Sequence, residues 1–281
     1  MSGRRKLSHR SKRAQRKTLH RFIPFIIVII IIFSAIIIYS NQPAPTDPKT
    51  FCPRDSLGQG MTALVIDVSD NLTNSQKARL ENELQNISNV SPGRLKAFLK
   101  KGEKLVVYFV ESEGQEPSKL FSMCHPGDVK NRTFSDELSE GLIFAQRKWK
   151  KFTQETVMII DAKIDSASLM ETSPIIETLQ FIRAKEFPPP DLINNAFNYR
   201  IVLWSDLLQN SIEATHFSSL GDFKDVVRRN PLELSGIQVS IFQFISKKYS
   251  QYQTKEHVTW WRKILATAQA DLVMWEKIEY E

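Results

Sequence analysis

The stretch ALVIDVSDN, residues 63–71, joins a run of apolar residues directly to a polar turn. A strand in the middle of a parallel sheet is covered on both faces, so its sequence is continuously apolar rather than alternating. Polar residues directly after such a strand mark its carboxyl end, which is where open α/β sheets bind their ligands. The stretch therefore predicts a buried central strand at residues 63–67, followed by a candidate binding site.

Similar apolar runs, rich in β-branched residues, recur along the chain. They predict strands at residues 104–110 (KLVVYFV), 156–161 (TVMIID), 200–204 (RIVLW), 237–245 (IQVSIFQFI) and 271–278 (DLVMWEKI). Amphipathic stretches between them predict helices at residues 75–87, 135–152, 173–185 and 254–269, and a short helix at residues 223–229. Residues 73–76 and 135–137 offer capping side chains, and Pro174 suits a first helical position.

This alternation of strands and helices is typical of a doubly wound α/β domain with a mainly parallel, six-stranded, Rossmann-like sheet. We expect the domain to occupy residues 62–281. Within it, Trp260, Trp261 and Trp275 are expected to pack on the sheet, because large aromatic side chains dominate cores.

Residues 22–39 form a run of 18 residues without a charge, ten of them Ile. As a helix they span about 27 Å, which just crosses a bilayer. The run is longer than that of a cleavable signal peptide and has no small-x-small cleavage site at its end. We expect an uncleaved transmembrane signal anchor.

The charges that flank this run predict its orientation. Residues 1–21 carry nine of the 38 Lys and Arg and no acidic residue, whereas only Lys49 and Arg54 are basic in the fifteen residues after the run. The positive-inside rule places the basic tail in the cytoplasm. In a bacterium, the chain is then an inner-membrane protein with a periplasmic C-terminal domain.

Net charge argues against nucleic acid as a partner, although the pI is about 9.3. Without the tail, the chain has 29 basic and 31 acidic residues, so the folded part has no excess of basic residues. A nucleic-acid-binding domain needs a basic face. The basic run at residues 147–151 is expected to be the solvated face of a helix.

Residues 40–61 contain four prolines and are expected to form an extended tether between anchor and domain. The tether holds Cys52, and the other cysteine is Cys124. In an oxidising compartment, two cysteines are most simply one disulfide. The alternative is one buried and one exposed thiol; His125 beside Cys124 is a weak signal for metal or nucleophile chemistry.

Two predicted strands end in carboxylates beside hydroxyls: Asp67 and Ser69 follow the first, and Ser205 and Asp206 follow the strand at 200–204. If these strands are neighbours where the strand order reverses, Asp67 and Asp206 converge on one crevice. Carboxylate and hydroxyl oxygens suit a hard cation, Mg²⁺, Mn²⁺ or Ca²⁺, and suit zinc poorly.

In this pattern the chain resembles the von Willebrand factor A-type (vWA) domain, whose metal-ion-dependent adhesion site follows Asp-x-Ser-x-Ser, then Thr, then Asp. The resemblance covers residues 62–278. It implies metal ligands at Asp67, Ser69, Asn71, Thr172 and Asp206. Ser173 is the alternative to Thr172.

Asn71 departs from the pattern, because the family has Ser or Thr at that position. Its amide oxygen can bind a hard cation, Asp70 and Thr73 are alternatives for the same position, and Asn71 can equally cap the following helix. Asp161 also ends a predicted strand, at the sheet edge by the family's order, and ranks below the other ligands. His216 lies in a loop and is expected to be solvated.

The resemblance implies a protein-interaction module in which an acidic side chain of an envelope partner completes the coordination of the cation. One alternative is a metal-free structural subunit of a membrane complex, with Asp67 and Asp206 in a structural network. Another is a metal-assisted phosphoester hydrolase. With only ten glycines, no phosphate-cradling loop and no Ser/His/Asp arrangement, we do not expect an enzyme.

Overall fold

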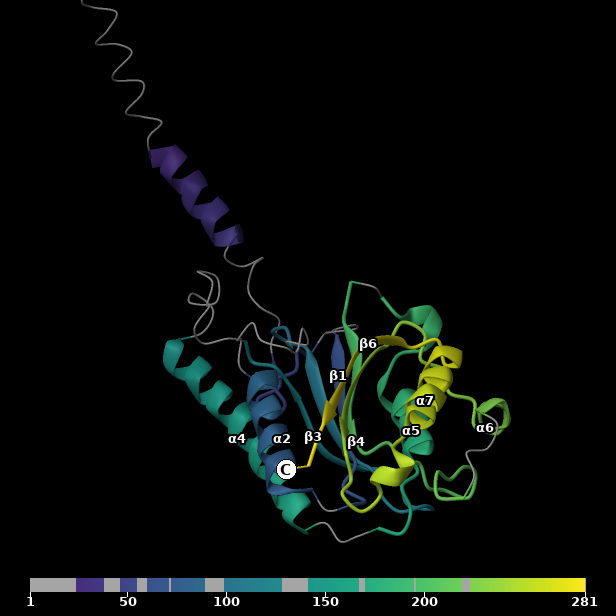
Figure 1. The fold of residues 1–281 in the computed structure, drawn as a ribbon. Helices are drawn as coiled ribbons and strands as arrows, with labels where there is room; N and C mark the ends of the chain where they lie inside the picture. Colours follow the sequence, from purple (N-terminus) through teal and green to yellow (C-terminus); the bar gives the residue numbers. More distant parts are fainter. Residues whose placement is uncertain are drawn as a thin grey trace, which may run out of the picture.

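A mainly parallel six-stranded sheet with helices on both faces forms the domain (Figure 1). The computed structural model describes residues 24–37, 46–54, 60–70, 72–88, 99–127, 141–166, 170–194, 196–218 and 223–280. The strands are β1 (Met61–Ile66), β2 (Lys104–Phe109), β3 (Ser118–Cys124), β4 (Tyr199–Ser205), β5 (Gln238–Phe244) and β6 (Asp271–Ile278). Their order is β3-β2-β1-β4-β5-β6, and only β3 pairs with its neighbour antiparallel.

Strand β1 lies in the middle of the sheet, and all six of its side chains are buried. Because side chains alternate across a strand, β1 contributes to two cores. Ala63 and Val65 belong to the core on one face, and Leu64 and Ile66 belong to the core on the other. The predicted buried central strand is confirmed.

Helices α2 (Asn74–Ser88) and α4 (Leu142–Ser166) cover one face of the sheet, and α5 (Ile175–Glu186), α6 (Phe223–Arg229) and α7 (Lys255–Thr267) cover the other (Figure 1). Trp260 and Trp261 of α7 are buried on the face of the sheet that α5, α6 and α7 cover, as predicted.

One predicted cap, at residues 73–76, is present, the other, at residues 135–137, lies outside the described residues, and Pro174 lies one position earlier than expected. Before α2, Thr73 Oγ1 accepts from the Gln76 backbone N, and Gln76 Oε1 accepts from the Thr73 N, which is a reciprocal capping box. At the start of α7, Thr254 accepts from the His257 N. Pro174 is the N-cap of α5 rather than its first helical residue.

One predicted strand is wrong: residues 156–161 belong to α4. The buried residues of this helix, Phe152, Thr156 and Ile160, are spaced by four, which is the helical period. Asp161 therefore lies on a helix and not at the end of a strand. The predicted helix at 135–152 extends instead to Ser166, and its first residues, 135–140, lie outside the described residues.

The disulfide between Cys52 and Cys124 is present, as predicted, with a Cα–Cα distance of 4.8 Å. The Cys124 backbone N also donates to the Thr50 carbonyl at 2.7 Å. Residues 46–54, the middle of the expected tether, are thereby held against the end of β3.

Residues 24–37 form an α-helix whose side chains are all exposed. Within the described part of the chain, no helix is both long and apolar enough to span a membrane. The ends of the predicted anchor, 22–23 and 38–39, and the basic tail lie outside the described residues.

Candidate functional site

The candidate site lies where the chain reverses its direction of winding across the sheet. From β1 the chain proceeds to β2 and β3 on one side, and later from β4 to β5 and β6 on the other. Strands β1 and β4 are adjacent and parallel, so their carboxyl ends flank the reversal point, where α/β sheets bind ligands. Asp67 and Asp206 directly follow these two strands.

Asp67 is fully buried and accepts three hydrogen bonds from the described residues. Its Oδ1 accepts from the Ser69 backbone N at 2.9 Å. Its Oδ2 accepts from Ser173 Oγ at 3.0 Å and from Ser205 Oγ at 2.8 Å. The carboxylate therefore joins the segments after β1, before α5 and at the end of β4, and Ser173 rather than Thr172 contacts it.

Asp206 is also buried, but it is less fully bonded. Its Oδ1 accepts from the Leu208 N at 2.9 Å, and within the described residues its Oδ2 accepts no hydrogen bond. Burial, and then the nearby charge of Asp67, raises the pKa of Asp206 well above its usual range. A cation beside Asp206 would oppose both effects, because it favours the charged carboxylate.

The backbone beside Asp206 is held in a strained conformation. Leu207 has a φ of 62°, in the left-handed region that a branched side chain rarely adopts. Its carbonyl accepts from His257 Nε2 and Trp261 Nε1, both at 2.7 Å, and the Asp206 carbonyl accepts from Gln253 Nε2 at 2.8 Å. These three donors fix the direction of the Asp206 side chain.

A cavity of about 500 Å³ opens at this end of the sheet. Three of the five predicted ligands line it: Ser69, Thr172 and Asp206. Asp67 lies beneath the cavity through its bond to Ser173, which lines it, and Asn71 lies outside the described residues.

Two hydroxyls are available in this cavity to different degrees. Within the described residues the Ser69 hydroxyl makes no hydrogen bond, whereas Thr172 Oγ1 accepts from the Glu113 backbone N at 2.9 Å. Since a hydroxyl oxygen has two lone pairs, Thr172 retains one for a further contact.

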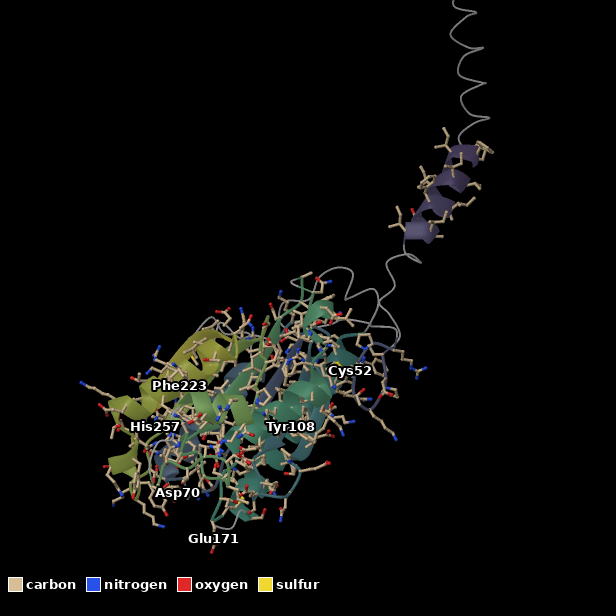
Figure 2. All side chains as sticks on the ribbon, turned by 90° about the vertical axis from the view of Figure 1, so that its right-hand side faces the viewer. Cys52, Asp70, Tyr108, Glu171, Phe223 and His257 are labelled. Carbon is tan, nitrogen blue, oxygen red and sulfur yellow. A yellow bond between two sulfur atoms is a disulfide. The ribbon has the colours of Figure 1, made fainter. Side chains whose placement is uncertain are left out.

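The remaining lining residues make the cavity acidic. Asp70 and Glu171 join Asp206, and Lys248 is the only basic side chain among the described residues that line the cavity. Asp70 Oδ2 is hydrogen-bonded to Ser246 Oγ, which joins the loop after β1 to the loop after β5. Figure 2 shows Asp70 and Glu171 at the same end of the domain.

The sequence does not predict the contributions of Lys248 and Ser246, because nothing in it indicates which loop folds over the crevice.

In the part of the chain that is described, no cluster of three or more His, Cys, Asp or Glu side chains is arranged to hold a metal. The predicted set contains only two carboxylates, completed by hydroxyl and amide oxygens.

His216 is buried, and the expectation of a solvated side chain is wrong. Its ring lies 4.6 Å from that of His257 and 4.8 Å from that of Trp260, measured between centroids. Burial, followed by the neighbouring His257, lowers the pKa of His216 to about 3. The two neutral imidazoles belong to the support of the Asp206 loop and not to the cavity wall.

Comparison with known proteins leaves the family open. No family model matches the chain, and no curated protein matches it. Among solved structures, the chain is similar to proximal thread matrix protein 1 from the mussel byssus, with a TM-score of 0.38 and 12% identity. The match covers 79% of this chain and 42% of the mussel chain, and a likeness this distant carries no functional argument.

Proposed function

We propose that the protein is a membrane-anchored interaction module whose vWA-like domain binds a divalent cation in the cavity beside Asp206. The observation that carries the proposal is the buried carboxylate of Asp206, which lines an acidic cavity at the reversal point of the sheet and has one oxygen without a hydrogen bond from the described residues. A mainly parallel six-stranded sheet covered by helices is also the fold that the vWA resemblance implies.

The side chains divide into two roles. Asp206 and the hydroxyls of Ser69 and Thr172 would contact the cation, since these three residues line the cavity. Asp67 accepts three hydrogen bonds, and through them it would hold Ser69 and Ser173 in place. A set of oxygen ligands fits Mg²⁺, Mn²⁺ or Ca²⁺. A partner's acidic side chain would complete the coordination.

The anchor belongs to the same proposal. Residues 24–37 are helical with exposed apolar side chains, inside an uncharged run of 18 residues. A disulfide in the domain agrees with export to an oxidising compartment. In a bacterium, the anchor would hold the domain on the periplasmic side of the inner membrane, where it would bind an envelope protein.

Calorimetric titration of Mg²⁺, Mn²⁺ and Ca²⁺ into the full chain in detergent tests the cation site. We expect saturable binding that is lost in Asp206→Asn and weakened in Ser69→Ala. Asp225→Asn, an exposed carboxylate on α6, is the matched control and should bind like the unaltered chain. Absence of saturable heat in the millimolar range would remove the cation from the proposal.

One observation favours the metal-free structural subunit instead. Asp67 already accepts hydrogen bonds from three segments, so this part of the network is held together without a cation. A subunit of this kind would bind its partner equally well with and without a chelator. The adhesion-site proposal requires that the chelator abolish binding.

A further inference from the structure

The start of α4 exposes three consecutive large apolar side chains. Leu142, Ile143 and Phe144 are 54%, 63% and 61% exposed. Over the next two turns the helix carries four basic residues: Arg147, Lys148, Lys150 and Lys151. Apolar residues next to Lys and Arg on a helix are the combination that binds the interface of an anionic bilayer.

This end of α4 lies at the amino ends of the parallel strands. Cys124, the last residue of β3, pairs with Lys104, the first residue of β2. The next residue, His125, packs its ring 5.2 Å from that of Trp149 and 5.5 Å from that of Phe152. Residues 142–144 precede Trp149 by about two turns, roughly 8 to 10 Å along the helix.

The chain that comes from the N-terminal helix reaches the domain at this same place. Phe51 is buried, and the Nζ atoms of Lys148 and Lys151 lie 5.8 and 5.4 Å from the centroid of its ring. The disulfide at Cys52 fixes the segment there. Figure 2 shows Cys52 at the end of the domain nearer the N-terminal helix, opposite Asp70 and Glu171.

The connection between the helix and this segment is short. From residue 37 to residue 46 the chain can extend over about 30 Å at most, because an extended residue covers roughly 3.3 to 3.6 Å. A helix seated in a bilayer therefore keeps this face of the domain close to the headgroups. The apolar residues and the basic residues of α4 lie on that face.

We propose that residues 142–151 of α4 form a second membrane contact, which docks on an anionic bilayer surface. Leu142, Ile143 and Phe144 enter the interface, and the four basic residues lie over the phosphate groups. The inference rests on the proposed anchor. The contact orients the domain so that the acidic cavity, at the opposite end, points away from the membrane.

Amide hydrogen exchange on the full chain in liposomes tests the contact. The liposomes contain phosphatidylcholine alone or phosphatidylcholine with phosphatidylglycerol, and flotation in a density gradient first reports whether the anchor inserts. We expect exchange over residues 142–151 to be roughly tenfold slower with phosphatidylglycerol, because the contact protects the helix start from opening. Exchange over α6 should not change.

Three variants sharpen the test. Ile143→Ser with Phe144→Ser should abolish the protection without changing the thermal midpoint, since both side chains are exposed. Met158→Ser on the same helix, where Met158 is 68% exposed, is the matched control and should retain it. Charge reversal by Arg147→Glu with Lys150→Glu should remove the preference for phosphatidylglycerol.

The outcomes separate the two proposals. If the chain floats but phosphatidylglycerol does not slow exchange, the second contact is wrong and the anchor stands. If the chain does not float, the anchor is wrong and the contact fails with it. If soluble polyglutamate slows exchange and the anionic bilayer does not, the surface binds an acidic protein and the membrane contact is overturned.

Discussion

Ser205 serves two groups at once beside the candidate site. Its hydroxyl donates to Asp67 Oδ2 and accepts from the Leu207 backbone N, both at 2.8 Å. Ser205→Ala leaves a buried N–H without its acceptor and a buried carboxylate with one donor fewer. We expect the free energy of unfolding, measured in urea, to fall by about 2–4 kcal/mol.

Ser240 on β5 supplies the matched control for this substitution. It is buried on the strand next to β4, and in the described part of the chain its hydroxyl has no hydrogen bond. Ser240→Ala should therefore change the free energy of unfolding by less than about 1 kcal/mol. Equal losses in the two variants would mean that packing, and not the Asp67 network, makes Ser205 important.

His216 should make the domain sensitive to mild acid. Its pKa is lowered to about 3 by burial and then by His257, whereas an unfolded chain has the ordinary value near 6.5. Below about pH 6.5 the imidazole is protonated in the unfolded chain but stays neutral in the folded domain. The free energy of unfolding therefore falls as the pH falls toward 3. The slope approaches about 1.4 kcal/mol per pH unit for this group.

Comparison with His216→Gln isolates this effect in urea unfolding between pH 7 and pH 4. The comparison is necessary because Asp206, whose pKa is raised, acts in the opposite direction: the folded domain holds its proton more tightly than the unfolded chain does. We expect a smaller loss of stability with acidification in the variant. Parallel curves would contradict the assignment to His216.

At the scale of the elements, Glu186 fastens the end of α5 to the edge of the sheet. It accepts hydrogen bonds from Lys104 Nζ at 2.9 Å, Tyr108 Oη at 2.7 Å and Lys119 Nζ at 2.6 Å. Burial by itself raises the pKa of Glu186, but the hydrogen bonds from Lys119, Tyr108 and Lys104 lower it to about 2.

We expect Glu186→Gln to lower the free energy of unfolding by about 2 kcal/mol, as for a buried charged acceptor whose two ammonium partners still reach water. Urea unfolding at pH 7 provides the measurement. Glu155→Gln is the matched control, because Glu155 is 44% exposed and 3.9 Å from Lys151, and it should cost less than about 0.5 kcal/mol. A similar small loss in both variants would contradict the role of Glu186.

The sequence predicts the elements of this fold unevenly, for physical reasons. Strands such as β1 and β4 are buried on both faces, so an unbroken apolar run identifies them. The edge strand β3, SKLFSMC, is half exposed and lacks such a run. Residues 156–161 have the composition of a strand, yet they lie in α4 because the burial of Phe152, Thr156 and Ile160 continues a helical spacing.

The same contrast holds for the candidate site. Asp67 and Asp206 are predictable because each directly follows a buried strand, and adjacency of β1 and β4 brings them together. A further carboxylate that lines the cavity, Asp70, is hydrogen-bonded to Ser246, which lies 176 positions away in the sequence. Contacts of this range depend on how the loops fold over the sheet, and local residue patterns contain no information about that.

At the scale of the whole molecule, the two ends of the domain have different chemistry. One end carries the acidic cavity with Asp70 and Glu171, and the other carries Cys52 (Figure 2) and, by its contacts with His125, the start of α4. Because the strands of the sheet are rigid spacers between these ends, changes at one end should leave the other intact. The disulfide offers a way to test this separation.

Cys52 and Cys124 are 72 residues apart, and their bond restricts the unfolded chain over that length. Replacing both by Ser should lower the free energy of unfolding of the full chain in detergent by about 2–4 kcal/mol in urea, since a loop of this size loses that much closure entropy. Below the unfolding transition, cation affinity in calorimetry should stay unchanged, because the bond lies at the end opposite to Asp206. A parallel loss of affinity would contradict the independence of the two ends, and a stability change below about 1 kcal/mol would show that the bond constrains the unfolded chain little.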